Sequence, residues 1–212
     1  MGSAATDIIL ESKRSRKKNK GPVHGVGIID VPFSVRGTVD GKKIYHRAFK
    51  VWNSILQRCY YPPIQAKYPS CIGCSVSPEW LLFSGFLKWW KANFHEGWEI
   101  DKDLLFPGNK IYSPDKCLFV PCDLNSFVIS REAKRGPSPI GSTFDARYGV
   151  YRTTISLGKG KKHYLGSFAC PDEAYAAWLN AKLKLAEQFK PICDEIHPQL
   201  YDSLLTKIRS IK

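Results

Sequence analysis

Residues 151–168 read YRTTISLGKGKKHYLGSF, and this stretch decides the fold of the C-terminal part of the chain. Apolar and polar side chains alternate over 151–157, which is typical of a strand with one buried face. The glycine-containing segment 157–161 predicts a hairpin turn, and 162–168 predicts the returning strand. The alternation separates two sets of side chains. Tyr151, Thr153, Ile155 and Leu157 are expected on one face, and Arg152, Thr154 and Ser156 on the other.

A helix is predicted directly after this hairpin. Pro171-Asp172-Glu173 is typical of a first helical turn, and Pro191 ends the pattern. The apolar stripe includes small residues that let a helix lie close to a sheet. Its members are Ala174, Trp178, Ala181, Leu185 and Phe189. Another amphipathic helix is predicted within 195–212, where it is expected either to pack on the module or to mediate dimerisation.

The N-terminal half reads as a helical unit rich in tryptophan. From Tyr45, apolar residues recur at three- and four-residue steps until Tyr61-Pro62-Pro63 ends the helix. Ser77-Pro78-Glu79 begins a second helix, and 135–139 reads as a linker because it contains two prolines and a glycine. The tryptophans follow the helical spacing and are expected in the core. The chain is therefore predicted to be α+β in four parts: a disordered basic tail over 1–22, a helical unit over 23–134, a sheet-and-helix module over 139–190, and a C-terminal helix over 195–212.

Charge is distributed unevenly along the chain. The formal net charge is +13, and residues 131–163 carry eight basic side chains against two acidic ones. Such a surface favours a polyanionic partner, because lysine and arginine neutralise phosphates and release condensed counterions. Residues 94–127 invert the balance, with three basic and six acidic side chains. This acidic stretch is a candidate cation site.

The module over 139–190 resembles the Apetala2-type DNA-binding domain. Leu165-Gly166-Ser167-Phe168 matches the family's turn into its helix, and Asp172-Glu173-Ala174 matches the helix start. The family's usual tryptophan in the first strands is absent, with Tyr148 or Tyr151 in its place. The resemblance implies a sheet that enters the major groove of double-stranded DNA. Arg152 then becomes the candidate for a base edge, with Thr154 on the same face, and the expected phosphate contacts are Arg147, Lys159, Lys161 and Lys162.

The acidic stretch Ile100–Asn125, within a core of 96–127, resembles the ββα-metal core of HNH homing endonucleases. The correspondence runs through Ile100-Asp101, the Gly108-Asn109 turn, Val120-Pro121 and Asn125. Lys102 stands where the family has its general-base histidine. The resemblance implies catalytic positions at Asp101, Lys102, Asp103 and Asn125. Metal-dependent phosphodiester cleavage is therefore either retained in a divergent form or lost.

Two kinds of metal site follow from these residues. Asp101, Asp103 and Asn125 offer oxygen ligands for Mg²⁺ or Mn²⁺, since the two carboxylates of D-x-D on a strand share a face. The alternative is that both aspartates brace the hairpin, with Lys102 or Lys110 as partners. Cys71-x-x-Cys74 with Cys117 and Cys122 suggests zinc, but the second spacing is loose, so reduced thiols are expected instead.

Two functions from different classes remain open. The first is a phage-type or mobile-element DNA-binding protein of the HNH endonuclease family. The second is a catalytically inactive phage protein that uses the scaffold to bind a host protein, in regulation or counter-defence. No run approaches the roughly 18 apolar residues of a membrane span, and the first residues of the sequence lack the apolar core of a secretory signal. We therefore expect a protein without membrane contact in the cytoplasm of a bacterial host cell, with its oligomeric state open.

Overall fold

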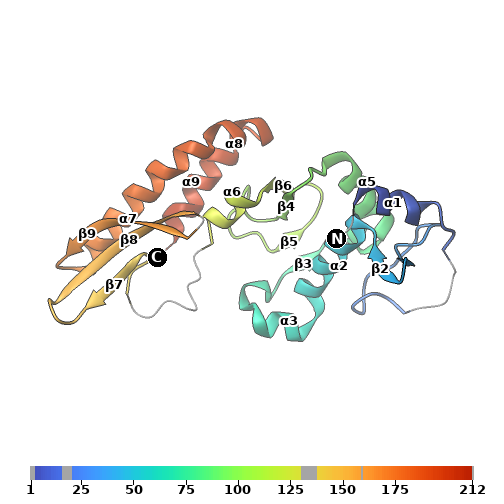
Figure 1. Ribbon diagram of the computed structural model, residues 1–212, viewed down its shortest axis with the longest axis horizontal. Coiled ribbons are helices and arrows are strands. Elements are labelled where there is room, and N and C mark those ends of the chain that lie inside the picture. Colours follow the sequence, from blue (N-terminus) through green and yellow to red (C-terminus); the bar gives the residue numbers. More distant parts are fainter. Residues whose placement is uncertain (1–2, 16–20, 130–137, 159, 212) are drawn as a thin grey trace. The chain divides into compact units, whose positions relative to one another are not determined.

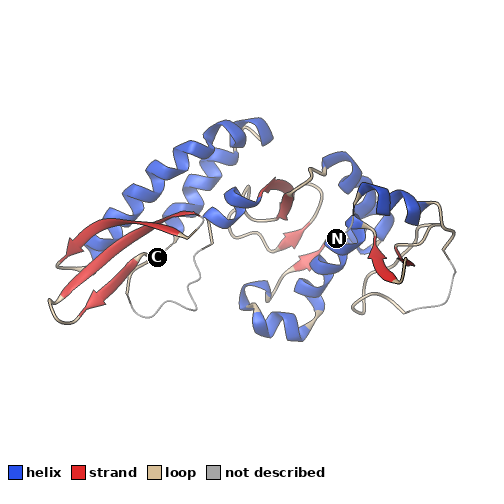
Figure 2. Ribbon diagram, in the orientation of Figure 1, coloured by secondary structure: helices blue, strands red, loops and turns tan. Residues whose placement is uncertain are grey.

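The computed structural model describes residues 3–15, 21–129, 138–158 and 160–211 (Figure 1). The chain forms two compact units. Unit 1 contains Met1–Asp103 and Gly108–Phe119, and unit 2 contains Leu104–Pro107 and Val120–Lys212. Each unit combines helices with small sheets (Figure 2), so the α+β prediction is confirmed. Within the described ranges, no helix is long and apolar enough to cross a membrane.

Unit 1 is mostly helical, with short two-stranded sheets at its edges. Its helices are α1 (Ala4–Glu11), α2 (Arg47–Tyr60), α3 (Pro62–Lys67), the 3₁₀ helix η1 (Pro69–Cys71), α4 (Pro78–Leu81) and α5 (Phe83–Asn93). β1 (Arg36–Val39) pairs with β2 (Lys42–Tyr45) in antiparallel fashion, and β3 (Ser75–Val76) pairs with β5 (Ile111–Tyr112) in parallel. β4 (Trp98–Asp101) pairs with β6 (Leu118–Pro121), a strand that runs on from unit 1 into unit 2.

The predicted stripe of α2 is buried against α5. Trp52 is fully buried, its ring centroid lies 5.3 Å from that of Phe83, and its indole N–H donates to the Trp80 carbonyl at 2.6 Å. The expectation that these tryptophans belong to the core is confirmed for Trp52, for Trp80 (also fully buried) and for Trp90 at 5% exposure. The helix begins at Arg47 and not at Tyr45, because Tyr45 closes β2 and the His46 ring accepts the first free N–H, that of Ala48, at 3.2 Å.

The prediction of a disordered tail over 1–22 is wrong for Ala4–Glu11, which form α1. Ser3 caps this helix, its hydroxyl accepting the Thr6 N–H at 3.3 Å. Leu10 is fully buried against residues that lie far along the sequence, with its side chain close to Gly37. The helix was missed because eight residues with two exposed isoleucines show no clear amphipathic stripe. The basic residues at 16–20 lie outside the described residues.

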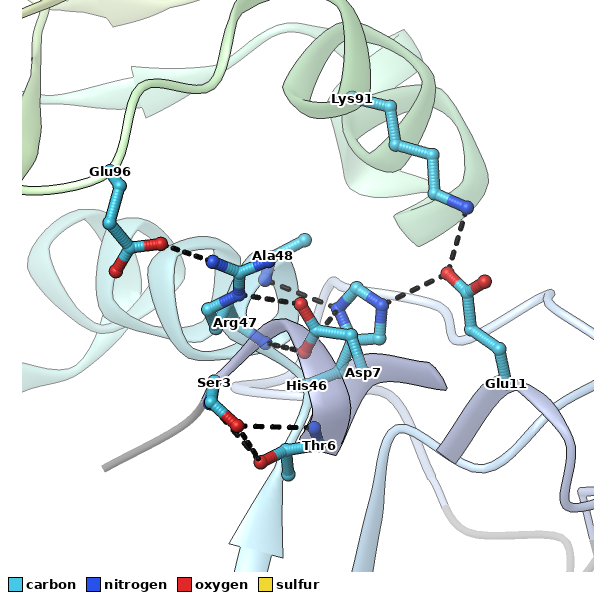
Figure 3. Close-up of polar contacts among 9 residues, drawn as sticks. All are labelled: Ser3, Thr6, Asp7, Glu11, His46, Arg47, Ala48, Lys91 and Glu96. Atoms are coloured by element: carbon cyan, nitrogen blue, oxygen red, sulfur yellow. Dashed lines mark hydrogen bonds and ion pairs between the residues drawn. The ribbon is translucent and has the colours of Figure 1, made fainter. Parts of the chain in front are cut away.

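Charged side chains hold α1 against the start of α2 (Figure 3). Asp7 accepts the Arg47 backbone N–H at 2.8 Å and pairs with the Arg47 Nε at 2.6 Å. Glu11 accepts from His46 Nε2 at 3.1 Å and from Lys91 Nζ at 2.8 Å. Burial raises the pKa of Glu11, but the hydrogen bonds from Lys91 and His46 outweigh it and leave the pKa below its ordinary value. This polar cluster is structural, because the His46 ring is enclosed.

Unit 2 is a three-stranded sheet with helices. Its elements are α6 (Cys122–Phe127), β7 (Ser142–Asp145), β8 (Val150–Gly158), β9 (Lys161–Phe168), α7 (Pro171–Ala186), the 3₁₀ helix η3 (Glu187–Phe189), α8 (Lys190–Ile196) and α9 (Leu200–Ser210). The strands are antiparallel in the order β7-β8-β9 (Figure 1). The predicted hairpin is confirmed, and so is the helix after it. Its predicted end at Pro191 is wrong, because α7 ends at Ala186 and Pro191 lies in the first turn of α8, where a proline is tolerated. The linker proposed at 135–139 lies mostly outside the described residues.

One face of the sheet is covered by α7. Ile155 on β8 and Trp178 on α7 share a core cluster, and Thr153 beside them is fully buried. The C-terminal helix α9 packs on this module, which was the first of the two alternatives expected from the sequence. Leu204 is fully buried, and the Tyr175 hydroxyl donates to the Ile211 carbonyl at 2.8 Å. The opposite face of the sheet is therefore the one that the strands present to solvent.

Candidate nucleic-acid interface

The alternation predicted for β8 is confirmed at its centre. Thr153 and Ile155 are buried under α7, whereas Arg152 and Ser156 are exposed on the other face. The prediction fails at the hairpin end, where Leu157 is 52% exposed, because the strand register shifts between Ser156 and Gly158. Only the central positions of β8 therefore keep a strict two-face pattern.

Thr154 belongs to the Arg152 face but is half-buried there. Its backbone N–H donates to the Gly141 carbonyl at 2.8 Å, and its hydroxyl lies 3.4 Å from the same oxygen. The register also shifts between Thr153 and Thr154, which leaves Thr154 opposite Tyr164. The Thr154 hydroxyl is therefore engaged within the module.

Arg152 lies on the solvent face of β8, the central strand of the sheet. The register places Thr143 on one side of it and Ser167 on the other. Both neighbours are short hydroxyl side chains, and the Arg152 side chain is 53% exposed. Because its cross-strand neighbours are short and half of the side chain is exposed, part of the guanidinium is accessible to a ligand that approaches this face.

Asp145 and Tyr148 hold the Arg152 guanidinium, and sequence reasoning identified neither of them in this role. The Asp145 Oδ2 lies 2.9 Å from Arg152 Nη2, and the Tyr148 ring centroid lies 5.6 Å from the guanidinium carbon. Asp145 was counted only as an acid within a basic stretch. Its position, two residues after Thr143 on β7, was the available signal, since alternate residues of a strand share a face. Of the two tyrosines proposed to replace the family tryptophan, Tyr148 is the one beside Arg152, and Tyr151 instead contacts Phe144.

Basic side chains lie at both ends of the β8 strand. Arg147 lies in the turn between β7 and β8, and Lys161 and Lys162 begin β9; all three are exposed. Within the described ranges, none of the three has an ion pair. Lys159, the other expected phosphate contact, lies outside those ranges. Tyr164 adds a 56%-exposed ring two residues after Lys162, with its hydroxyl 2.7 Å from that of Ser167.

The hairpin proposed as an HNH centre has a different local structure from the one expected. β4 ends at Asp101, so Asp103 is not on a strand and the two carboxylates are not placed together by strand alternation. Asp101 Oδ1 instead accepts the Asp103 backbone N–H at 2.8 Å. The Lys102 ammonium lies 3.3 Å from Asp103 Oδ2 and donates to the Asn109 carbonyl at 3.0 Å. These contacts are those of the bracing alternative, with Lys102 as the partner of Asp103. Lys110, the other partner considered, donates to the Ser70 carbonyl at 2.8 Å.

Asn109 is the residue that organises this hairpin. Its amide Nδ2 donates to the carbonyls of Lys102 at 2.7 Å and Ile111 at 2.8 Å, and its Oδ1 accepts the Ile111 N–H at 3.1 Å. The sequence indicated only a turn at Gly108-Asn109. Asparagine supplies both a donor and an acceptor in one plane, which explains why this residue type can close the loop from both sides.

The remaining predicted ligands are placed as follows. Asn125 lies on α6, in unit 2, whereas Asp101 and Asp103 belong to unit 1. No group of three or more histidine, cysteine, aspartate or glutamate side chains that could hold a metal occurs within the described residues. Cys117 is buried, and burial raises the pKa of its thiol to about 12, as expected for a thiol packed in a core.

Comparison with known proteins yields no match to a family model, to a curated protein or to a solved structure. The resemblances to Apetala2-type domains and to HNH endonucleases therefore stay predictions. We infer the function from the side chains of the chain itself and from their geometry.

Proposed function

We propose that this protein binds double-stranded DNA through the solvent face of β7, β8 and β9. The observation that carries the proposal is the exposed Arg152 on the solvent face of the central strand, with Lys162 on the same face toward the hairpin end and Arg147 and Lys161 exposed nearby in the turn and at the strand end. The other face of the sheet is packed on α7, so a ligand can approach the strands from one side only. The proposal places this binding in the cytoplasm of a bacterial host, as the family resemblance implies.

The cations on this face are expected to contact different parts of the DNA. Long cations without an internal partner attract phosphates in any sequence, and each phosphate contact releases a counterion. An arginine on a strand reaches the base edges when the sheet lies in the major groove, and its fork of N–H donors suits the two acceptors of guanine. Arg147, Lys161 and Lys162 are therefore assigned to phosphates and Arg152 to a base edge.

Salt dependence of binding tests the proposal. Fluorescence anisotropy with labelled 20-base-pair duplexes in 50 to 300 mM KCl should give a plot of log affinity against log salt with a slope of about −3 if three phosphates are neutralised. Lys161→Ala should flatten the slope by about 0.9. Lys184→Ala is the matched control, since it removes the same charge from an exposed position on α7. The control should behave as wild type.

Two outcomes would overturn the proposal. One is the absence of binding to any duplex at 50 mM KCl, which would favour the alternative of a module that binds a host protein. The other is an equal effect of Lys161→Ala and Lys184→Ala, because the attraction would then come from total charge and not from the sheet.

A further inference from the structure

The ion pair between Asp145 and Arg152 is unexpected on a face proposed to meet DNA. A carboxylate there repels phosphates, and it cancels the charge of the central arginine. The neighbouring cations differ, because Arg147, Lys161 and Lys162 have no ion pair within the part of the chain that the structure describes. The pair therefore contributes almost nothing to the electrostatic attraction of the face. What it retains is the directional hydrogen bonding of the guanidinium.

The geometry around Arg152 holds its side chain in one direction. Asp145 Oδ1 accepts the Arg147 backbone N–H at 3.1 Å, which closes the turn after β7, while Oδ2 lies 2.9 Å from Arg152 Nη2. Tyr148 in the same turn lies over the guanidinium at 5.6 Å. Asp145 thus holds one guanidinium nitrogen of Arg152 at the edge of the group, and the Tyr148 ring lies against its flat face. The guanidinium has five N–H donors in a fixed fork, so donors remain for a ligand.

We propose that Asp145 and Tyr148 are positioning residues that aim Arg152 at a base edge, so that Arg152 supplies sequence discrimination without adding electrostatic affinity. This inference rests on the proposed binding of DNA. Its physical basis is that an arginine held before binding loses less side-chain entropy when it makes a bidentate contact. A contact between Arg152 and a phosphate would not require residues that fix the arginine side chain, because phosphates accept hydrogen bonds from many directions.

A charge-neutral double variant separates the two roles of Arg152. Asp145→Asn with Arg152→Gln removes one negative and one positive charge, so the net charge of the face is unchanged. Asparagine keeps an oxygen for the Arg147 N–H, which preserves the turn. The full-length protein is first used to select preferred duplexes from a pool with 20 random base pairs. Affinities for the selected duplex and for the unselected pool are then measured against salt.

The double variant is expected to bind the unselected pool with the wild-type affinity and salt slope, and to lose about tenfold or more of its preference for the selected duplex. Asp145→Asn alone should also lose preference, while its slope steepens by about 0.9 because the released arginine neutralises a phosphate. Tyr148→Ala should lose preference with an unchanged slope. A merely structural ion pair would change stability and leave the preference intact.

The outcomes distinguish the inference from the proposal beneath it. If wild type binds no duplex, the proposed function fails and the inference fails with it. If wild type selects a sequence and Asp145→Asn selects it equally well, the positioning role alone is overturned. If the double variant flattens the salt slope by about 0.9, Arg152 contacts a phosphate and the inference is again wrong. The Trp178 indole NMR signal, compared between variants, confirms that the module remains folded.

Discussion

Lys182 on α7 is a buried cation, and replacing it with methionine should stabilise unit 2. The residue is 8% exposed, and its ammonium lies 3.4 Å from the centroid of the Phe127 ring. Burial lowers the pKa of Lys182 from its ordinary value of 10.5 to about 8. At 1.36 kcal/mol per pKa unit, this lowering corresponds to a cost of about 3 kcal/mol for holding the charge inside the fold. The Phe127 ring contacts the charge, but burial still leaves the charged form disfavoured.

The sign of the pH dependence follows from these values. Below pH 8 Lys182 is protonated in both the folded and the unfolded protein, so the full cost is present. Between pH 8 and 10.5 the folded protein has lost the proton while the unfolded protein retains it, and the free energy of unfolding therefore rises with pH. Lys182→Met should stabilise unit 2 by about 3 kcal/mol at pH 7, and the advantage should disappear near pH 10.5.

Urea unfolding of wild type and Lys182→Met at pH 7 and pH 10 measures this difference. Unit 1 contains the other five tryptophans, so the Trp178 indole NMR signal is the probe that reports on unit 2 alone. Other titrating groups affect both proteins equally and cancel in the comparison. A stability difference that stays the same at both pH values would show that the Lys182 charge is not held at a cost, and would refute the reasoning.

Three further predictions concern the hairpin, the DNA and α1. Asn109→Ala should lower the free energy of unfolding of unit 1 by about 1–3 kcal/mol in urea, because two carbonyls and one N–H lose their hydrogen-bond partner. The control is Asn93→Ala, which removes a single exposed hydrogen bond on α5 and should lower the same free energy by less than about 1 kcal/mol. Supercoiled plasmid with Mg²⁺ or Mn²⁺ should be shifted but not nicked, whereas nicking that Asp101→Ala abolishes would establish a nuclease. Leu10→Ala should release α1 at a cost of about 2–5 kcal/mol, measured as faster amide exchange over 4–11, and unchanged exchange would contradict the packing seen for this helix.

Local periodicity was enough to predict the elements of unit 2 that carry the candidate interface. The alternation over 151–157 depends only on which faces of a strand meet water, and the stripe from Ala174 depends only on helical spacing. The helical stripe was confirmed, and the alternation was confirmed at the centre of β8 but not at Leu157, so Arg152 is exposed as expected. The stripe of α2 was predicted for the same reason. Its start was misplaced because the cap at His46 and the pairing of Tyr45 in β2 depend on residues of the preceding hairpin.

The tertiary structure decided which side chains are partners. Asp145 and Arg152 are seven residues apart and meet only because β7 and β8 pair in one register, and Asn109 reaches Lys102 only once the hairpin has closed. The folding of α1 required Leu10 and Asp7 to find residues about 30 to 40 positions away. Composition and periodicity describe each segment by itself, so the sequence determined the elements and the basic character of the chain. The contacts that orient Arg152 and brace Lys102 arise between segments, and only packing specifies them.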